Sequence, residues 1–330
     1  MGDGPMSGLL EHLCGISEPR VLVFGMTGRQ GRRSSRLMTG FGTRILAGCT
    51  PGKGGQEVDG TPVFDNAAEA LERFPDLNAA VLFVPARAVL SAASEALEAG
   101  IKFLVVTADG VPTHDAIVVA ERARPHQAKF LGPNTVGMVD TSGYLFGMLG
   151  GRTSWARKSY QPGCIGVISR SGGLSQLLGA FHCRPHLPAP RPDGTYGPVW
   201  GEQPPGVSAV VCIGGDPVPG VSMLDAARAF QADTRTRVIA VYGETGTRQE
   251  NDLAGAVAAG EITKPVVVFL GGKFTKSGVA QSHAGAIVRA EADTYSAKRR
   301  LLEEAGAAVV ERPDAVFGRV ASLLGLLPAD

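Results

Sequence analysis

Residues 20–31 read Arg-Val-Leu-Val-Phe-Gly-Met-Thr-Gly-Arg-Gln-Gly, an apolar run that leads into a turn with glycine at every third position. The run predicts a buried strand, and the polar stretch after it predicts a helix. Glycines at such a junction let the backbone approach a phosphate, and free amides at the helix N-terminus bind its charge. The spacing is G-x-x-G-x-x-G, and no acidic residue suited to a ribose closes the next apolar run. A nucleotide-type ligand is therefore predicted, and NAD is not favoured.

The same alternation of apolar runs and amphipathic stretches continues along the chain. Predicted strands cover residues 20–25, 44–49, 79–84, 102–107, 128–131, 165–169, 208–213, 237–242, 265–270 and 307–310, and predicted helices in the first half cover 30–39, 67–73, 88–99 and 113–124. Continuous apolar strands need cover on both faces, so we expect parallel, doubly wound α/β sheets. A loop-rich segment at 141–163 interrupts the pattern. We therefore place two α/β domains at residues 1–159 and 160–330.

Residues 181–206 depart from the pattern because they contain seven prolines. Proline at this density is incompatible with a helix or a central strand, so we expect an inserted loop on the solvated surface. A lid or partner-binding role is the alternative, since loops of this length are often functional. His182 and His186 lie within it with a proline between them, and we expect no metal site there.

The composition excludes several classes of protein. With 44% hydrophobic residues and a formal charge of +1, the 330-residue chain has no bulk attraction to nucleic acid or to a membrane surface. No apolar run is long enough to span a bilayer, and no secretory leader is recognisable. The five cysteines are odd in number and scattered, which is typical of reduced thiols, so we expect a cytoplasmic protein.

A second glycine-containing turn follows the predicted strand at 165–169. There Ser171, Gly172 and Gly173 would present consecutive amides at the start of a helix, where an anion is favoured. Two acids, Asp109 and Glu244, also follow predicted strands, where ligand crevices of α/β sheets open. A carboxylate bonded to one imidazole nitrogen leaves the other nitrogen as a nucleophile, and His283 lies among small residues that allow close approach. Capping of the next helix is the alternative role for both acids.

These motifs resemble a known family, the α subunits of succinyl-CoA synthetases and the related ligase module of ATP-citrate lyase, which are NDP-forming acyl-CoA ligases. The resemblance extends from Arg20 to Leu326 apart from the proline-rich segment. It rests on eight motifs in the same order: GMTGRQG (25–31), TPGKGG (50–55), VPA (84–86), GPNTVG (132–137), SRSGG (169–173), IGGDPVPG (213–220), GETG (243–246) and SHAGA (282–286).

The resemblance implies a Rossmann-like domain that binds coenzyme A, followed by a flavodoxin-like ligase domain. It implies that His283 carries a phosphoryl group, with Glu244 as its orienting carboxylate and Asp109 as a second acid nearby. Ser171, Gly172 and Gly173 would receive the histidine-bound phosphate. The residues that it implies for coenzyme A are Gly25, Thr27, Gly28, Gln30, Lys53, Val84 and Pro85.

The resemblance also implies a partner. ATP or GTP, with magnesium, would be bound by an ATP-grasp β-type subunit, because no ATP-grasp segment is recognisable here. The expected substrate is a small di- or tricarboxylate of the succinate, malate or citrate type, with Arg152, Arg170 and Arg289 as candidate carboxylate partners. The expected activity is therefore formation of an acyl-CoA through phosphohistidine and acyl phosphate.

Three alternatives stay open at this point. The family usually has glutamate where this chain has Asp109, and the residues after His283 differ from the succinate type, so a non-catalytic CoA-binding regulatory homologue is one alternative. The second is an acyl-phosphate ligase whose acceptor is an amine in place of CoA. The third is an ordinary NAD-dependent dehydrogenase, which leaves SRSGG and SHAGA unexplained.

Overall fold

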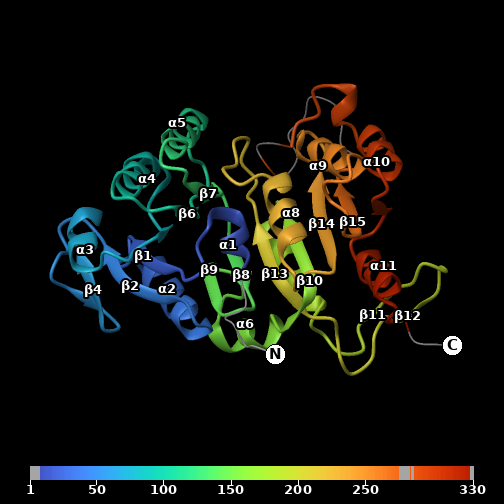
Figure 1. Ribbon diagram of the computed structural model, residues 1–330, viewed down its shortest axis with the longest axis horizontal. Coiled ribbons are helices and arrows are strands. Elements are labelled where there is room, and N and C mark those ends of the chain that lie inside the picture. Colours follow the sequence, from blue (N-terminus) through green and yellow to red (C-terminus); the bar gives the residue numbers. More distant parts are fainter. Residues whose placement is uncertain (1–7, 275–282, 284–285, 328–330) are drawn as a thin grey trace. The chain divides into compact units, whose positions relative to one another are not determined.

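The computed structural model describes residues 8–274, 283 and 286–327. The chain divides into two compact units, the first made of Met1–Arg157 with Cys212–Val221 and the second of Lys158–Val211 with Ser222–Asp330. Figure 1 shows the first mainly in blue and green and the second mainly in yellow to red. The linear division near residue 159 stays a prediction.

The first unit contains a sheet whose strands lie in the order β3-β4-β2-β1-β5-β6-β7. Its strands are β1 (Arg20–Phe24), β2 (Arg44–Cys49), β3 (Glu57–Val58), β4 (Thr61–Phe64), β5 (Ala79–Leu82), β6 (Phe103–Val106) and β7 (Lys129–Leu131). All neighbouring pairs are parallel except β3 with β4. In chain order the parallel strands run 3-2-1-4-5-6, the order of dinucleotide-binding folds, and the order reverses between β1 and β5. Such a reversal is where α/β sheets bind ligands.

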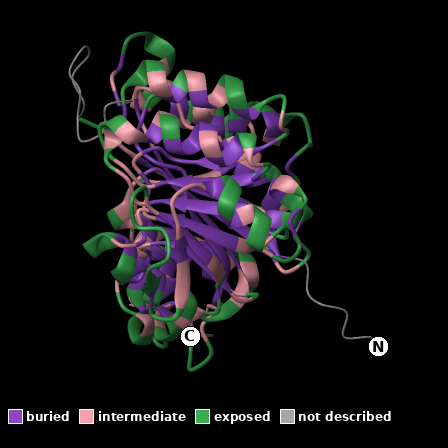
Figure 2. Cartoon of the chain, turned by 90° about the vertical axis from the view of Figure 1, so that its left-hand side faces the viewer, coloured by how far each residue is buried: buried purple, intermediate pink, exposed green. Residues whose placement is uncertain are grey.

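The helices of this unit follow the strands. They are α1 (Leu9–Cys14), α2 (Arg29–Phe41), α3 (Ala67–Arg73), α4 (Val89–Glu98), α5 (Thr113–Ala123) and α6 (Thr153–Ser159), with the 3-10 turn η1 (Ala86–Ala88). All residues of β5 and β6 are buried, because helices cover both faces of the strands. Figure 2 shows the strands as mostly buried and the outer helix faces as exposed. Small residues on α4, among them Ala92, Ala93 and Ala96, allow close packing on the sheet.

The second unit contains strands in the order β16-β15-β14-β10-β13. These are β10 (Pro162–Ser169), β13 (Val207–Cys212), β14 (Val238–Glu244), β15 (Val266–Gly271) and β16 (Ala308–Val310), with helices α7 (Gly172–Phe181), α8 (Met223–Ala232), α9 (Gln249–Ala258), α10 (Tyr295–Glu304) and α11 (Ala315–Leu324) and the 3-10 turn η2 (Glu291–Asp293). The pairs β10–β14, β14–β15 and β15–β16 are parallel. In chain order the strands run 2-1-3-4-5, the flavodoxin-like order, which reverses beside β10 and β14. Both predicted fold classes are confirmed.

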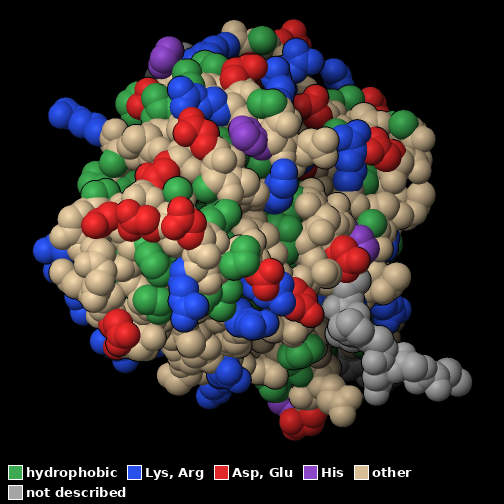
Figure 3. Space-filling model, turned by 60° about the vertical axis from the view of Figure 1, so that its left-hand side comes forward, with side chains coloured by type: hydrophobic (Ala, Val, Ile, Leu, Met, Phe, Trp, Pro, Cys, Tyr) green, Lys and Arg blue, Asp and Glu red, His purple; other side chains and the backbone are tan. Residues whose placement is uncertain are grey.

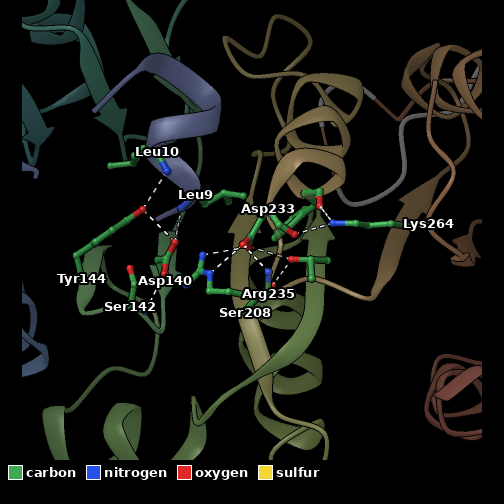
Figure 4. Close-up of polar contacts among 11 residues, drawn as sticks. Leu9, Leu10, Asp140, Ser142, Tyr144, Ser208, Asp233, Arg235 and Lys264 are labelled. Carbon is green, nitrogen blue, oxygen red and sulfur yellow. Dashed lines mark hydrogen bonds and ion pairs between the residues drawn. The ribbon is translucent and has the colours of Figure 1, made fainter. Parts of the chain in front are cut away.

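The expectation of a loop-rich segment at 141–163 is wrong. An antiparallel hairpin of β8 (Gly137–Asp140) and β9 (Tyr144–Gly147) extends into it, and α6 follows. Asp140 fixes the hairpin, since its carboxylate accepts from the Leu9 amide at 2.6 Å and from the Tyr144 hydroxyl at 3.0 Å (Figure 4). The Tyr144 oxygen accepts from the Leu10 amide at 3.0 Å, so α1 is attached to the hairpin. Helix α1 has only six residues, too short for a periodic pattern to reveal it.

A separate buried network strengthens the second unit. The Asp233 carboxylate, just after α8, accepts from Arg235 Nε at 2.9 Å and from the Thr236 hydroxyl at 3.0 Å (Figure 4). Thr236 Oγ1 is 2.6 Å from the Ser208 hydroxyl on β13, and Lys264 donates to the Asp233 carbonyl at 2.6 Å. These contacts tie the end of α8 to β13 and to the entry of β15.

The proline-rich segment 181–206 is not simply a solvated loop, which corrects that expectation. Strands β11 (Pro188–Pro190) and β12 (Tyr196–Pro198) form an antiparallel hairpin. Its prolines are tolerated because a hairpin that is not inside a larger sheet does not need an amide donor at every position. Its base is held by aromatic packing, since Trp200 is buried and the His182 ring lies edge-on to Phe317 with centroids 4.9 Å apart. The indole of Trp200 donates to the Arg184 carbonyl at 2.6 Å.

None of the described helices is long and apolar enough to cross a membrane. On the face in view in Figure 3, acidic and basic side chains are intermixed, in keeping with the formal charge of +1.

Candidate functional site

A cavity of about 400 Å³ opens in the first unit at the reversal of strand order. It brings together five of the residues predicted to bind coenzyme A: Gly25, Thr27, Gly28, Val84 and Pro85. The remaining lining is Phe24, Cys49, Thr50, Pro51, Phe83, Ala88, Ser91, Ala92 and Glu95. These residues end or follow β1, β2 and β5 or lie on η1 and α4, so the crevice lies at the carboxyl ends of the strands. Its mixed apolar and turn-derived lining suits a ligand with an apolar arm and a phosphate-bearing end.

Two glycines of the first motif are required by the backbone geometry. Gly25 has φ +71°, and a Cβ there would lie 2.4 Å from the Phe83 carbonyl oxygen. At Gly31 a Cβ would lie 2.3 Å from the Gly25 carbonyl oxygen, so glycine lets α2 pack close to the turn. Gly28 is the N-cap of α2 and supplies no side-chain cap, so the amides of the first helical turn face outward for an anion.

Gln30 and Lys53, the other two residues predicted for coenzyme A, are not part of this lining. Gln30 is exposed and its amide nitrogen donates to Ser34 Oγ at 2.8 Å. Lys53 is exposed, and its main-chain amide donates to the Thr50 carbonyl at 3.0 Å, which closes a turn. Their roles stay predictions. Glu95 was missed by sequence analysis, because a glutamate in an amphipathic helix carries no distinguishing signal.

A second cavity, of about 200 Å³, opens in the second unit where β10 and β14 meet the reversal of strand order. It contains the predicted residues Ser171, Glu244 and His283 together. Its other lining residues are Arg170, Leu174, Tyr242, Gly243, Thr245, Gly271, Gly272 and Ala286. Three segments far apart in sequence therefore meet at one crevice.

Glu244 links a histidine and an arginine at this cavity. Its Oε2 lies 2.8 Å from His283 Nδ1, and its Oε1 lies 2.7 Å from Arg170 Nη1. The Arg170 side chain is 1% exposed and that of Glu244 is 13% exposed, so the ion pair is shielded from water. Arg170 was a candidate partner for the substrate carboxylate, and the structure instead pairs it with Glu244.

The bond to Glu244 selects the tautomer of the neutral imidazole. A carboxylate only accepts, so Nδ1 must carry the proton and Nε2 keeps its lone pair. In that tautomer Nε2 is the nitrogen with a lone pair available, as the predicted role of His283 requires.

The predicted phosphate cradle forms the start of α7. The Ser171 hydroxyl accepts from the Leu174 amide at 3.4 Å and caps the helix, and the Ser171 amide donates to Ser169 Oγ at 3.1 Å. Gly172 and Gly173 form the first turn of α7 and are absent from the described lining of the cavity. Only Ser171 of the three lines the crevice directly.

A buried ion pair behind Glu244 was missed by sequence analysis. Lys298 Nζ and Glu250 Oε2 lie 2.5 Å apart, and both side chains are 0% exposed. Lys298 also donates to the Glu244 carbonyl at 3.1 Å and to the Thr247 carbonyl, while Glu250 Oε1 accepts from the Glu244 amide at 3.0 Å. The pair thus fixes the main chain on both sides of Glu244. The available signal was the position of Lys298 on the buried stripe of α10, four residues before Leu302.

Asp109 follows β6 in the first unit and is exposed. Its proposed place near His283 stays a prediction. Gln281 and Ser282, which precede His283 in the motif, lie outside the described residues.

Comparison with known proteins gives the family. Residues 17–110 match the family model of the CoA binding domain, and residues 199–308 match that of CoA-ligase. An ADP-forming sulfoacetate–CoA ligase subunit of an Acholeplasma species is 36% identical over 309 residues, covering 94% of this chain and 97% of that protein. The chain belongs to the NDP-forming acyl-CoA ligase family, as an α-type module.

Further relatives agree with this assignment. The α subunit of ADP-forming succinate–CoA ligase of Methanothermobacter thermautotrophicus is also 36% identical, covering 94% of this chain and 96% of that protein. The solved ATP citrate lyase of Methanothrix soehngenii, in complex with citrate and coenzyme A, superposes with a TM-score of 0.80 and 25% identity, covering 95% of this chain. This chain spans about half of that lyase chain, 52%. The family resemblance read from the motifs is confirmed.

Proposed function

We propose that this chain is the α-type subunit of an ADP-forming acid–CoA ligase and that His283 carries the phosphoryl group. The observation that supports this most strongly is the Arg170–Glu244–His283 series of contacts in the second cavity. It gives His283 the tautomer that a phosphoryl acceptor needs, in a site at the carboxyl ends of the strands.

In the first step, the lone pair of His283 Nε2 attacks the terminal phosphorus of ATP. The P–N bond forms as the bond between that phosphorus and the bridging oxygen breaks, and ADP leaves with the electron pair. Glu244 accepts the Nδ1 proton in a hydrogen bond and balances the positive charge that develops on the ring, while Arg170 pairs with the other carboxylate oxygen and holds Glu244 in position. The nucleotide, with magnesium, would be bound by an ATP-grasp β-type partner subunit.

In the second step, a carboxylate oxygen of the acid attacks the phosphorus and the P–N bond breaks, which restores neutral His283. The product is an acyl phosphate. In the third step, the sulfur of coenzyme A attacks the acyl carbon. The bond from that carbon to the phosphate oxygen breaks, inorganic phosphate leaves with the electron pair, and the thiol proton passes to solvent. The amides at the start of α7 and the Ser171 region would stabilise the transferred phosphoryl group.

Coenzyme A fits the cavity of the first unit. Gly25 lets the turn after β1 lie close to the Phe83 main chain, and the amides at the start of α2 provide an anion site beside an apolar crevice. Thr27, Gly28, Val84 and Pro85 would line the pantetheine and diphosphate path, with Gln30 and Lys53 nearby on exposed positions.

We propose a small acid with a second anionic group as the substrate. The expectation from the motifs was succinate, malate or citrate. Relatives of near-equal identity act, by name, on sulfoacetate and on succinate, and both acids carry a carboxylate and a second anion. A sulfonate therefore joins the carboxylates as a candidate second group.

The test is a thioester assay on the complex of this chain with its ATP-grasp partner. Sulfoacetate, succinate, malate and citrate are supplied one at a time with ATP and coenzyme A, and products are identified by mass. We expect a CoA thioester and ADP from one acid. Acyl phosphate made equally well without coenzyme A, and diverted to an amine, would favour the non-CoA acceptor. Binding of coenzyme A with no ADP from any acid would favour the regulatory homologue.

A further inference from the structure

Tyr242 lines the second cavity, and its buried hydroxyl bonds to none of the residues that the structure describes. Tyr242 is 2% exposed, and its hydroxyl oxygen has no hydrogen-bond partner among the described residues. A buried hydroxyl without a partner costs free energy, so a phenylalanine would fit this position better on stability grounds alone.

The direction of the Tyr242 side chain follows from the strand. Side chains two residues apart on a strand point to the same face, so Tyr242 and Glu244 on β14 share one face and both line the cavity. The ring is held by Phe269, its paired neighbour on β15, with centroids 6.4 Å apart and the planes at 51°. Burial and this contact position the ring, and the hydroxyl proton can turn toward an acceptor.

Burial raises the pKa of the Tyr242 hydroxyl well above its ordinary value, so the group keeps its proton at neutral pH and can donate. The other polar groups of the wall are Arg170, Ser171 and Thr245 with the Glu244–His283 pair. A protonated donor beside a guanidinium and a helix N-terminus is suited to an oxyanion with several acceptor oxygens.

We infer that Tyr242 is a hydroxyl donor of the phosphoryl site proposed above, contacting an oxygen of the phosphoryl group carried by His283. This inference rests on the proposed function and adds a residue to it. Tyr242 breaks and forms no covalent bond. It stabilises the phosphorylated state relative to the free histidine, and it orients the phosphorus toward the incoming acid.

The test compares wild type with Tyr242→Phe in the complete ligase complex. We expect the equilibrium constant for phosphorylation by ATP, measured by intact mass at fixed ADP to ATP ratio, to fall about tenfold or more. Affinity for coenzyme A should not change, and thermal stability should be equal or higher, because the unpartnered hydroxyl is removed. The matched control is Tyr160→Phe, which removes another buried hydroxyl of this unit, one that contacts the Gln176 carbonyl. It should leave phosphorylation unchanged.

Equal phosphorylation constants in wild type and Tyr242→Phe would overturn the inference and leave the proposed function standing. Failure of the wild-type complex to take up phosphate would contradict the proposed function itself. In that case, titration of the complex with inorganic phosphate judges the role of Tyr242 separately. Weaker phosphate binding in Tyr242→Phe, but not in Tyr160→Phe, supports it, and equal binding overturns it.

Discussion

Glu244 Oε2 lies 2.8 Å from His283 Nδ1, although the two residues are 39 positions apart in the sequence. The opposite oxygen of the same carboxylate is paired with the buried Arg170. Glu244 therefore cannot rotate away from the imidazole without breaking its shielded ion pair with the Arg170 guanidinium, which is unfavourable. The contact fixes which nitrogen of His283 is free to react.

Replacing Glu244 by Gln should slow phosphorylation of the chain by roughly 10²–10⁴-fold, since the amide neither fixes the tautomer nor balances the imidazolium charge. Rapid-quench measurement of phosphate uptake from ATP checks this. Coenzyme A affinity, measured in parallel, should stay at the wild-type value because its cavity lies in the other unit. A folded variant that is phosphorylated at the wild-type rate would reduce Glu244 to a structural role.

Lys298 and Glu250 should stabilise the fold as a pair. Because both are fully buried, Lys298→Met should lower the free energy of unfolding by about 3–5 kcal/mol, measured by urea denaturation. The double variant Lys298→Met/Glu250→Gln should lose less than the sum of the two single variants. The control is Arg300→Met on the same helix, whose exposed pair with Glu304 should contribute about 1 kcal/mol or less. Additive losses would show that the pair is not coupled.

The sequence predicted the sheets well because its strands are continuous apolar runs bounded by glycine. The predicted range 44–49 matches β2, and that at 67–73 matches α3. The same reasoning failed at residues 141–163, since β9 has only four residues and α6 buries a single residue, Ala156, which leaves no apolar period to detect.

His182 should make stability depend on pH. Burial lowers the pKa of its imidazole from the ordinary 6.5 to about 3. Below pH 6.5 the unfolded chain therefore takes up a proton that the folded chain does not, so the free energy of unfolding falls as the pH falls toward 3. Between pH 7 and pH 5 the free energy of unfolding should fall by about 2 kcal/mol from this cause.

Urea denaturation at pH 7 and pH 5 tests this, with His182→Leu expected to lack that loss. His186→Gln, which alters the exposed neighbouring histidine, should keep it. Equal pH dependence in wild type and His182→Leu would show that the buried ring is not the cause.

Gly25 should be essential for the coenzyme A cavity. In Gly25→Ala the new methyl would meet the Phe83 carbonyl at 2.4 Å and displace the turn, so the Kd for coenzyme A should rise at least about tenfold. Isothermal titration calorimetry measures it. The matched control is Gly100→Ala, which has a similar positive φ of +91° but no atom within 4 Å of the added methyl. A Kd for Gly25→Ala at the wild-type value, as expected for Gly100→Ala, would show that the close approach at Gly25 is not needed for binding.

The motif residues of the candidate site could be predicted from the sequence, but the buried residues that hold them in place could not. Ser171, Glu244 and His283 follow from turns at strand ends, and the topology brings them to one cavity. The sequence did not indicate the roles of four other residues, Arg170, Tyr242, Glu250 and Lys298, because these roles depend on burial and on distant partners. Lys298 and Glu250, for example, are 48 positions apart. Sequence spacing carries no record of such tertiary contacts.

Intact-mass analysis of this chain, after incubation with ATP and the ATP-grasp partner, would show directly whether His283 is phosphorylated. We expect a mass increase of one phosphoryl group that is lost on acid treatment and is absent in His283→Ala. One particular acid, together with coenzyme A, should discharge it. An increment of the same size in His283→Ala, or none in wild type with the partner bound, would contradict the proposed role of His283.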